Sequence, residues 1–163
     1  MPTRSFDASY FRRFYESRSS RVYGGEQIDH LARGVTGFVR WFGGDLERVL
    51  DVGAGTGLWH AWFSANLPDV RYRSIDVSEY ACEKYGHERR DISRWRGREK
   101  FDLIVCQGVL PYLDDAACAR AAANMAAILA GAHILRVHEV APARQVADIA
   151  DRLLAASADS AQS

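Results

Sequence analysis

The sequence predicts an α/β domain in which a parallel sheet is covered by helices on both faces. Two observations lead to this fold class. Short apolar runs alternate with segments of helical period from residue 48 onward, which is the pattern of parallel strands joined by helices. A length of 163 residues, 48% of them apolar, fits one structural domain with one core.

Two helices are expected before the first strand. Asp7 can cap a helix that carries an aromatic stripe, and a longer apolar stripe with helical spacing runs from Ile28 to Phe42 before Gly43-Gly44 ends it. We therefore expect residues 1–46 to form a helical lid or cap over an α/β part at residues 47–163. Four side chains are expected either to close over a ligand or only to pack on the sheet: Tyr10, Phe14, Tyr15 and Arg21.

The strands and helices that follow are placed by their apolar runs and by turn residues. Predicted strands cover residues 48–52, 70–77, 89–92, 102–106 and 132–140. Predicted helices cover residues 58–66, a segment opening at Ser78, residues 114–129 and residues 142–156.

A glycine-rich loop joins the first strand to its helix. The segment reads Asp51-Val52-Gly53-Ala54-Gly55-Thr56-Gly57. Glycine permits positive φ and a close approach of ligand to backbone, and the amides of the following helix N-terminus face such a ligand. The dinucleotide pattern G-x-G-x-x-G needs a glycine at position 58, where this chain has Leu58. The loop therefore predicts a ligand site, but its spacing departs from that of dinucleotide loops.

A second acid, Asp76, ends the next predicted strand. A carboxylate at that point of a doubly wound sheet can accept hydrogen bonds from both ribose hydroxyls of a nucleoside. Enzymes that use NAD share this feature, so Asp76 predicts an adenosyl cofactor without choosing its kind. A helix cap is the alternative role.

Asp51-x-Gly53-x-Gly55-x-Gly57 resembles motif I of the class I S-adenosylmethionine-dependent methyltransferases. Arg90-Asp91-Ile92, Phe101 to Gln107 and Gly108 to Leu113 resemble later segments of that family in the same order, with Tyr112 where a histidine is usual. The resemblance covers about residues 49–140. It implies these cofactor contacts: Asp51, Gly53, Ala54, Gly55, Gly57, Asp76, Asp91, Ile92, Gln107 and Gly108.

The resemblance also implies a fold and an activity. The fold is a doubly wound Rossmann-like sheet of order 3-2-1-4-5, and the activity is methyl transfer from S-adenosylmethionine to a small molecule. Two strands that follow strand five in the family have no expected counterpart here, which leaves residues 132–140 on an open edge. A homodimer along that edge, a partner that supplies the missing hairpin, or an aggregation-prone domain would each fit.

The composition argues against binding to nucleic acid, membranes or metal ions. Twenty-one basic and twenty-one acidic residues give no global field for nucleic acid or anionic membrane. No apolar run suits a membrane span or a secretory signal, so we expect a cytoplasmic protein. Three cysteines without C-x-x-C spacing and five scattered histidines predict no metal site.

The catalytic machinery stays unassigned at this level. A general base is needed only if the acceptor loses a proton, and none of the polar candidates is chosen: Tyr112, His30, His133 and His138. Two other functions remain open. One is an NAD-dependent oxidoreductase on the same type of sheet, and the other is a non-catalytic S-adenosylmethionine-binding domain.

Overall fold

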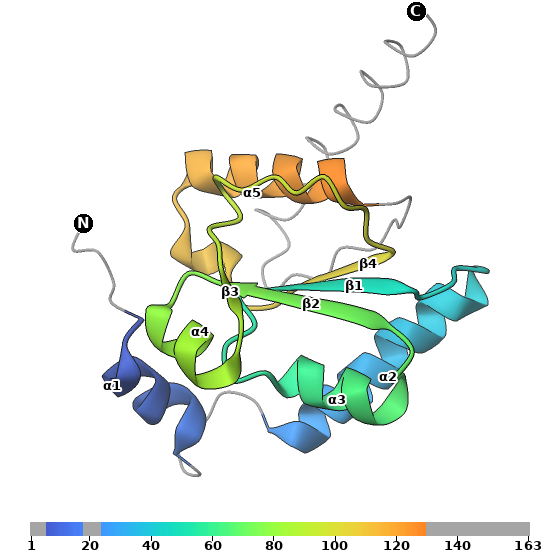
Figure 1. Cartoon of the computed structure of the whole chain (residues 1–163), viewed down its shortest axis with the longest axis horizontal. Helices are drawn as coiled ribbons and strands as arrows, with labels where there is room; N and C mark the ends of the chain where they lie inside the picture. The colour runs from blue at the N-terminus through green and yellow to red at the C-terminus, as the bar shows by residue number, and fades with distance from the viewer. Residues whose placement is uncertain (1–5, 18–23, 130–163) are drawn as a thin grey trace, which may run out of the picture.

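The computed structural model describes residues 6–17 and 24–129 of the chain (Figure 1). The first element, α1 (Ala8–Phe11), is continued by a π-helical turn, η1 (Arg12–Glu16). The remaining elements, in chain order, are α2 (Gly25–Trp41), β1 (Arg48–Val52), α3 (Leu58–Asn66), β2 (Arg71–Asp76), α4 (Glu79–Tyr85), β3 (Glu88–Arg89), β4 (Leu103–Cys106), the 3-10 turn η2 (Leu110–Tyr112) and α5 (Asp115–Ile128).

The described strands form one parallel sheet in the order β3-β2-β1-β4. Val49 of β1 lies opposite Tyr72 of β2 on one side and Leu103 of β4 on the other, which places β1 at the centre. This order confirms the 3-2-1-4 part of the prediction. The predicted fifth strand (132–140) and last helix (142–156) lie outside the described residues.

Helices cover both faces of the sheet, as predicted. In Figure 1, α5 lies above the strands, and α2, α3 and α4 lie below them. Successive residues of a strand point to opposite faces, so Val49 packs with α2 and α3 while Leu50 packs with α5. The two cores therefore meet at β1, which contributes to both.

The third strand is shorter than predicted. It covers only residues 88–89, whereas residues 89–92 were expected. After Arg89 the chain turns, because the Asp91 carboxylate accepts hydrogen bonds from Ser93 N and Oγ while the Asp91 carbonyl accepts from Trp95 N. Ile92 is consequently in a turn, where its buried side chain joins the core beneath α5.

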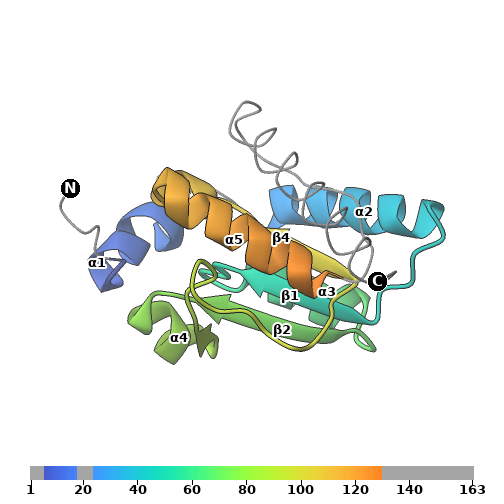
Figure 2. The same ribbon diagram turned by 90° about the horizontal axis from the view of Figure 1, so that it is seen from above.

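The N-terminal region divides into two parts with different positions. Helix α2 buries Ile28, Ala32 and Val39, and it packs on α3 and on one face of the sheet (Figure 2). It is thus part of a core layer. Residues 6–17, called here the N-terminal segment, lie instead beside α4 near the carboxyl ends of the strands (Figure 1).

Candidate functional site

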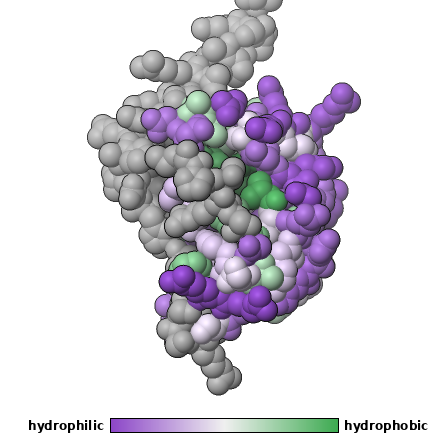
Figure 3. Space-filling view, turned by 90° about the vertical axis from the view of Figure 1, so that its left-hand side faces the viewer, coloured by the Kyte–Doolittle hydropathy of each residue, from purple (hydrophilic) through white to green (hydrophobic). Residues whose placement is uncertain are grey.

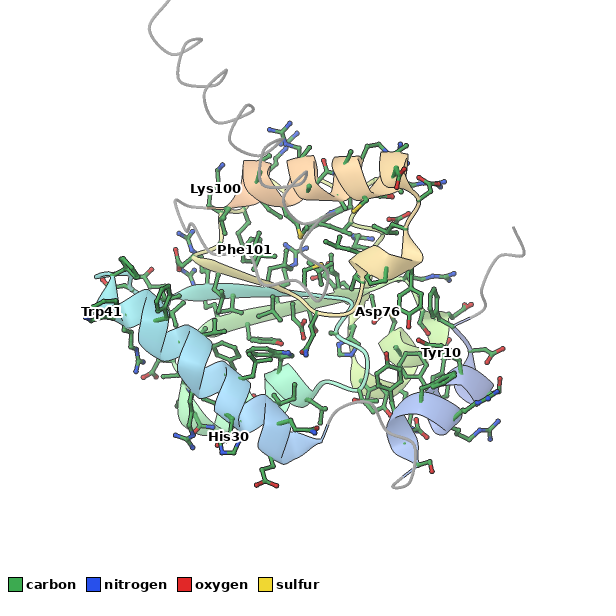
Figure 4. All side chains as sticks on the ribbon, turned by 180° about the vertical axis from the view of Figure 1, so that it is seen from behind. Tyr10, His30, Trp41, Asp76, Lys100 and Phe101 are labelled. Atoms are coloured by element: carbon green, nitrogen blue, oxygen red, sulfur yellow. The ribbon has the colours of Figure 1, made fainter. Side chains whose placement is uncertain are left out.

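A pocket opens at the carboxyl ends of β1, β2 and β4, which is where open α/β sheets bind their ligands. From this side, a patch of apolar surface is visible next to polar residues (Figure 3). Figure 4 shows Tyr10 and Asp76 at this end of the sheet and Trp41 at the opposite end. The lining includes every predicted cofactor contact except Gly57: Asp51, Gly53, Ala54, Gly55, Asp76, Asp91, Ile92, Gln107 and Gly108.

The glycine loop has the backbone conformation that its sequence predicts. Gly53, Gly55 and Gly57 all have positive φ, at 70°, 57° and 73°. A Cβ on Gly53 would collide with Val109 Cγ2, so the neighbouring loop leaves no room for a side chain there. Gly57 does not line the pocket. It is the N-cap residue of α3, and its N–H donates to the Ala54 carbonyl to close the turn.

Asp76 binds the loop directly. Its Oδ2 accepts a hydrogen bond from Gly55 N at 2.9 Å, and its Oδ1 accepts one from Ser78 N at 2.8 Å. Asp76 therefore orders both the glycine loop and the start of α4. An ionised carboxylate offers about four lone-pair positions, so this side chain retains acceptor capacity toward the pocket.

Asp51 is a buried acid at the floor of the pocket. The Tyr72 hydroxyl donates to its Oδ2 at 2.6 Å, and the side chain is 2% exposed. Burial raises the pKa of Asp51 to about 7; the Tyr72 hydrogen bond lowers it in part, and the nearby charge of Asp76 raises it again. A positive charge in the pocket would favour the ionised form of this acid.

Two further predicted contacts are held by specific partners. Gln107 Oε1 accepts a hydrogen bond from Trp59 Nε1 at 2.8 Å, which directs the amide of Gln107 at the end of β4. Asp91 uses Oδ1 to accept from Ser93, and its Oδ2 lies 3.6 Å from Arg94 Nε. Sequence reasoning did not select Trp59, although a tryptophan in the first turn after a glycine loop is a usable signal.

The N-terminal segment reaches across the pocket. Its aromatic side chains Phe6, Tyr10, Phe11 and Tyr15 line the cavity, and the hydroxyls of Tyr10 and Tyr112 lie 2.9 Å apart. Phe14, predicted with them, is not among the lining residues. Arg21 lies outside the described residues.

The same segment is fixed to α4 through Glu16. Its Oε1 accepts hydrogen bonds from Lys84 Nζ at 2.8 Å, Tyr85 OH at 2.9 Å and Tyr80 OH at 3.0 Å. These donors, led by Lys84, lower the pKa of Glu16. Ser78 Oγ also donates to the Phe6 carbonyl at 2.5 Å. The segment thus spans from α4 to η2.

The polar residues considered as a catalytic base differ in their position relative to the pocket. Tyr112 lines the pocket, whereas His30 is exposed on α2 and is not among the lining residues. His133 and His138 lie outside the described residues. Within residues 6–17 and 24–129, no group of three or more histidine, cysteine or acidic side chains is arranged to hold a metal ion. In the same ranges no helix has the length and apolar character to cross a membrane.

The parallel sheet, the glycine loop and the acids at the ends of β1 and β2 define a nucleotide-binding α/β domain. Residues 50–132 match a family described as "Methyltransferase domain". This match covers just over half of the 163 residues, and the chain belongs to that family. No curated protein matches the sequence.

The chain is similar to several solved structures. An S-adenosylmethionine-dependent methyltransferase from Clostridium acetobutylicum shares 17% identity, with a TM-score of 0.55, over 74% of this chain and 52% of its own. CalS10 from Micromonospora echinaspora, an amino pentose methyltransferase solved with S-adenosylmethionine, shares 22% identity over 65% of this chain and 45% of its own, with a TM-score of 0.47. DesVI from Streptomyces venezuelae shares 21% identity over 64% and 44%, also with a TM-score of 0.47. The chain spans about half the length of these proteins.

Proposed function

We propose that this chain binds S-adenosylmethionine and transfers its methyl group to a small-molecule acceptor. The observation that carries the proposal is the hydrogen bond between Gly55 N and Asp76 Oδ2. It ties the loop of the first strand to the acid of the second, so that both face one pocket. Membership of the methyltransferase domain family supports the proposal, as does the name of the structure from C. acetobutylicum.

Different residues of the pocket suit different parts of the cofactor. The remaining lone pairs of Asp76 suit the ribose hydroxyls, and Asp91 with the buried Ile92 suits the adenine amino group and ring. Asp51 lies beneath the glycine loop, where its carboxylate can pair with the ammonium group of the methionine part. When bound, S-adenosylmethionine supplies an electrophilic methyl carbon, so the protein contributes positioning and electrostatics.

The rest of the lining belongs to the acceptor. It is largely apolar, and the N-terminal segment contributes aromatic side chains to it. Gln107, held by Trp59, adds an amide to the pocket wall at the end of β4. Such walls exclude water and favour an uncharged acceptor with apolar surface. No catalytic base is assigned, because a base is needed only if the acceptor carries a proton that must leave.

Calorimetric titration tests the cofactor first. The protein is titrated with S-adenosylhomocysteine, S-adenosylmethionine and NAD. Micromolar binding of the two sulfur nucleosides without NAD binding is the expected result. Binding of NAD alone would instead make the chain an oxidoreductase candidate.

Methyl transfer is tested separately, because a non-catalytic binding domain also passes the titration. A screen over amines, phenols and carboxylic acids, with S-adenosylhomocysteine release as the readout, is expected to yield at least one acceptor. Cofactor binding with no turnover over the whole panel would favour the non-catalytic alternative.

Three predictions about the protein's surroundings belong to the same proposal. We propose a cytoplasmic location and no nucleic-acid partner, from the composition. We also propose a homodimer joined along residues 132–140, which lie outside the described residues. Size-exclusion chromatography with light scattering measures the oligomeric state, and a monomer at high concentration would contradict the dimer.

A further inference from the structure

His87 is a buried histidine directly behind the glycine loop, and the cofactor contacts proposed above do not use it. It follows α4 and is 7% exposed. Its Nε2 lies 3.0 Å from the Gly55 carbonyl oxygen, and its Nδ1 lies 2.9 Å from Ser74 Oγ on β2. Both ring nitrogens therefore have partners, one of them in the loop that lines the pocket.

The chemical nature of these two partners indicates which nitrogen of the His87 imidazole carries the hydrogen. A carbonyl oxygen can only accept, so Nε2 must donate to Gly55. The Ser74 hydroxyl can donate to Nδ1, which is the acceptor in the Nε2–H tautomer. Of the two neutral tautomers, the geometry therefore fits only the Nε2–H form, which is a measurable property.

Gly55 is held on both of its backbone groups. Its N–H donates to Asp76 Oδ2, and its carbonyl accepts from His87. The peptide that follows is trans, so the Thr56 N–H points opposite to the Gly55 carbonyl and away from His87. Thr56 lines the pocket, and none of the described residues accepts a hydrogen bond from its N–H.

We propose that His87 is a positioning residue for the cofactor. Its Nε2–H fixes the Gly55–Thr56 peptide so that the Thr56 N–H is presented to an oxygen of the bound nucleoside. This inference rests on the proposed function, because it assigns His87 a role in the same cofactor site. His87 itself touches the loop and not the ligand.

Two substitutions separate the roles of the two nitrogens. A glutamine amide nitrogen lies near the position of histidine Nε2, so His87→Gln keeps the donor to Gly55. An asparagine amide oxygen lies near the position of Nδ1, so His87→Asn keeps only an acceptor toward Ser74. Ser74→Ala is the matched control, since it removes the Ser74 hydroxyl and leaves the bond to Gly55.

The measurement is the affinity for S-adenosylhomocysteine by calorimetry, with thermal unfolding recorded for each variant. We expect His87→Gln and Ser74→Ala to bind close to the wild type, and His87→Asn to bind about three- to tenfold more weakly, the effect of one lost hydrogen bond. The proposal would be overturned if His87→Gln and His87→Asn had the same affinity as each other, whether that affinity equals the wild type's or is reduced. It would also be overturned by an affinity loss that follows the loss of thermal stability across all three variants.

A spectroscopic readout tests the contact without a ligand. Long-range ¹H–¹⁵N correlation spectra of the free protein are expected to show the Nε2–H tautomer for His87, and the Nδ1–H tautomer would contradict the geometry. The outcomes also distinguish the two proposals. If the wild type fails to bind S-adenosylhomocysteine, the proposed function fails. If the wild type binds and the His87 variants bind with the same affinity, only the role of His87 is contradicted.

Discussion

The phenolic oxygens of Tyr10 and Tyr112 lie 2.9 Å apart, although 102 positions separate them in the chain. Tyr10 belongs to the N-terminal segment, and Tyr112 ends the η2 turn after β4. Either hydroxyl can be the donor. The pair therefore joins the N-terminal segment to η2 across the pocket.

This pair predicts energetic coupling between the two tyrosines. Tyr10→Phe and Tyr112→Phe each keep the ring and remove one hydroxyl, and we expect a coupling of about 0.5–1 kcal/mol in the affinity for S-adenosylhomocysteine. The double variant should then lose no more than either single variant. Additive losses in the calorimetric cycle would show that the two hydroxyls act independently.

Asp51 predicts a pH-dependent stability. Its pKa of about 7 lies above the ordinary 3.8, so the folded protein retains a proton that the unfolded chain releases between these values. The stability that this group contributes is fully present below about pH 4 and is lost as the pH rises through 7.

Asp51→Asn cannot ionise and should remove that dependence. In urea unfolding, we expect the wild type to lose up to about 4 kcal/mol relative to this variant between pH 4 and pH 8. A difference between the two proteins that stays constant with pH would mean that Asp51 titrates normally in the folded state.

Asp76→Ala is expected to reduce the affinity for S-adenosylhomocysteine at least tenfold while the fold persists. The variant loses two proposed ribose hydrogen bonds, each worth about 1.5–3 kcal/mol when charge-assisted. It also loses the hydrogen bonds that the Asp76 carboxylate accepts from Gly55 N and Ser78 N in the wild type. Unchanged affinity in calorimetry would restrict the acid to holding the glycine loop and Ser78, the N-cap residue of α4.

Gly53→Ala tests the close approach of two loops. Alanine at a φ of 70° is strained, and its Cβ would collide with Val109 Cγ2. The matched control is Gly86→Ala, where φ is 79° and no atom lies within 4 Å of the added Cβ. Backbone strain alone should cost about 1–2 kcal/mol at Gly86, and Gly53→Ala should cost more.

The second step of this test removes the collision. Adding Val109→Ala to Gly53→Ala should recover part of the stability in urea unfolding, because the strain stays and the steric overlap is relieved. Equal losses for Gly53→Ala and Gly86→Ala would show that Val109 moves aside without cost.

Glu16→Ala should release the N-terminal segment from α4. Hydrogen exchange of residues 6–17 is expected to accelerate, whereas exchange in β1 and β2 should not change. Since the pKa of Glu16 is lowered mainly by Lys84, the attachment is retained at neutral pH and lost only as acid protonates the carboxylate. The control is Glu26→Ala at the start of α2, and faster exchange of residues 6–17 in both variants would exclude a specific role for Glu16.

Local sequence signals located the sheet and most of the site. The predicted helix 58–66 matches α3 to the residue, because a positive-φ glycine fixes its start and Pro68 follows soon after its end. Asp7 caps α1 through Ser9 N and Tyr10 N, as its position indicated. The predicted cofactor contacts lie mostly at or after the ends of strands, and the end of a strand can be recognised in the sequence as the point where an apolar run stops.

Most of the features that the sequence did not predict depend on contacts between residues that are far apart in the chain. The two residues of β3 take their conformation from β2, with Ile75 opposite Glu88. Nothing near His87 in sequence marks it as a neighbour of Gly55, since the contact exists only after β2, α4 and β3 have assembled. The aromatic stripe predicted a helix but not its π-helical continuation, in which Ser17 N donates to the Arg12 carbonyl.

Trp59 gives the pocket an intrinsic optical probe. Its indole N–H is bonded to Gln107 in the pocket wall, and the ring is 7% exposed, whereas Trp41 at the far end of α2 is 78% exposed. The chain has four tryptophans, and of these Trp59 lines the pocket, whereas the exposed Trp41 should emit at longer wavelength. A ligand that displaces or polarises Gln107 therefore changes the emission of Trp59 against the background of the other three, so occupancy can be followed in real time without any label.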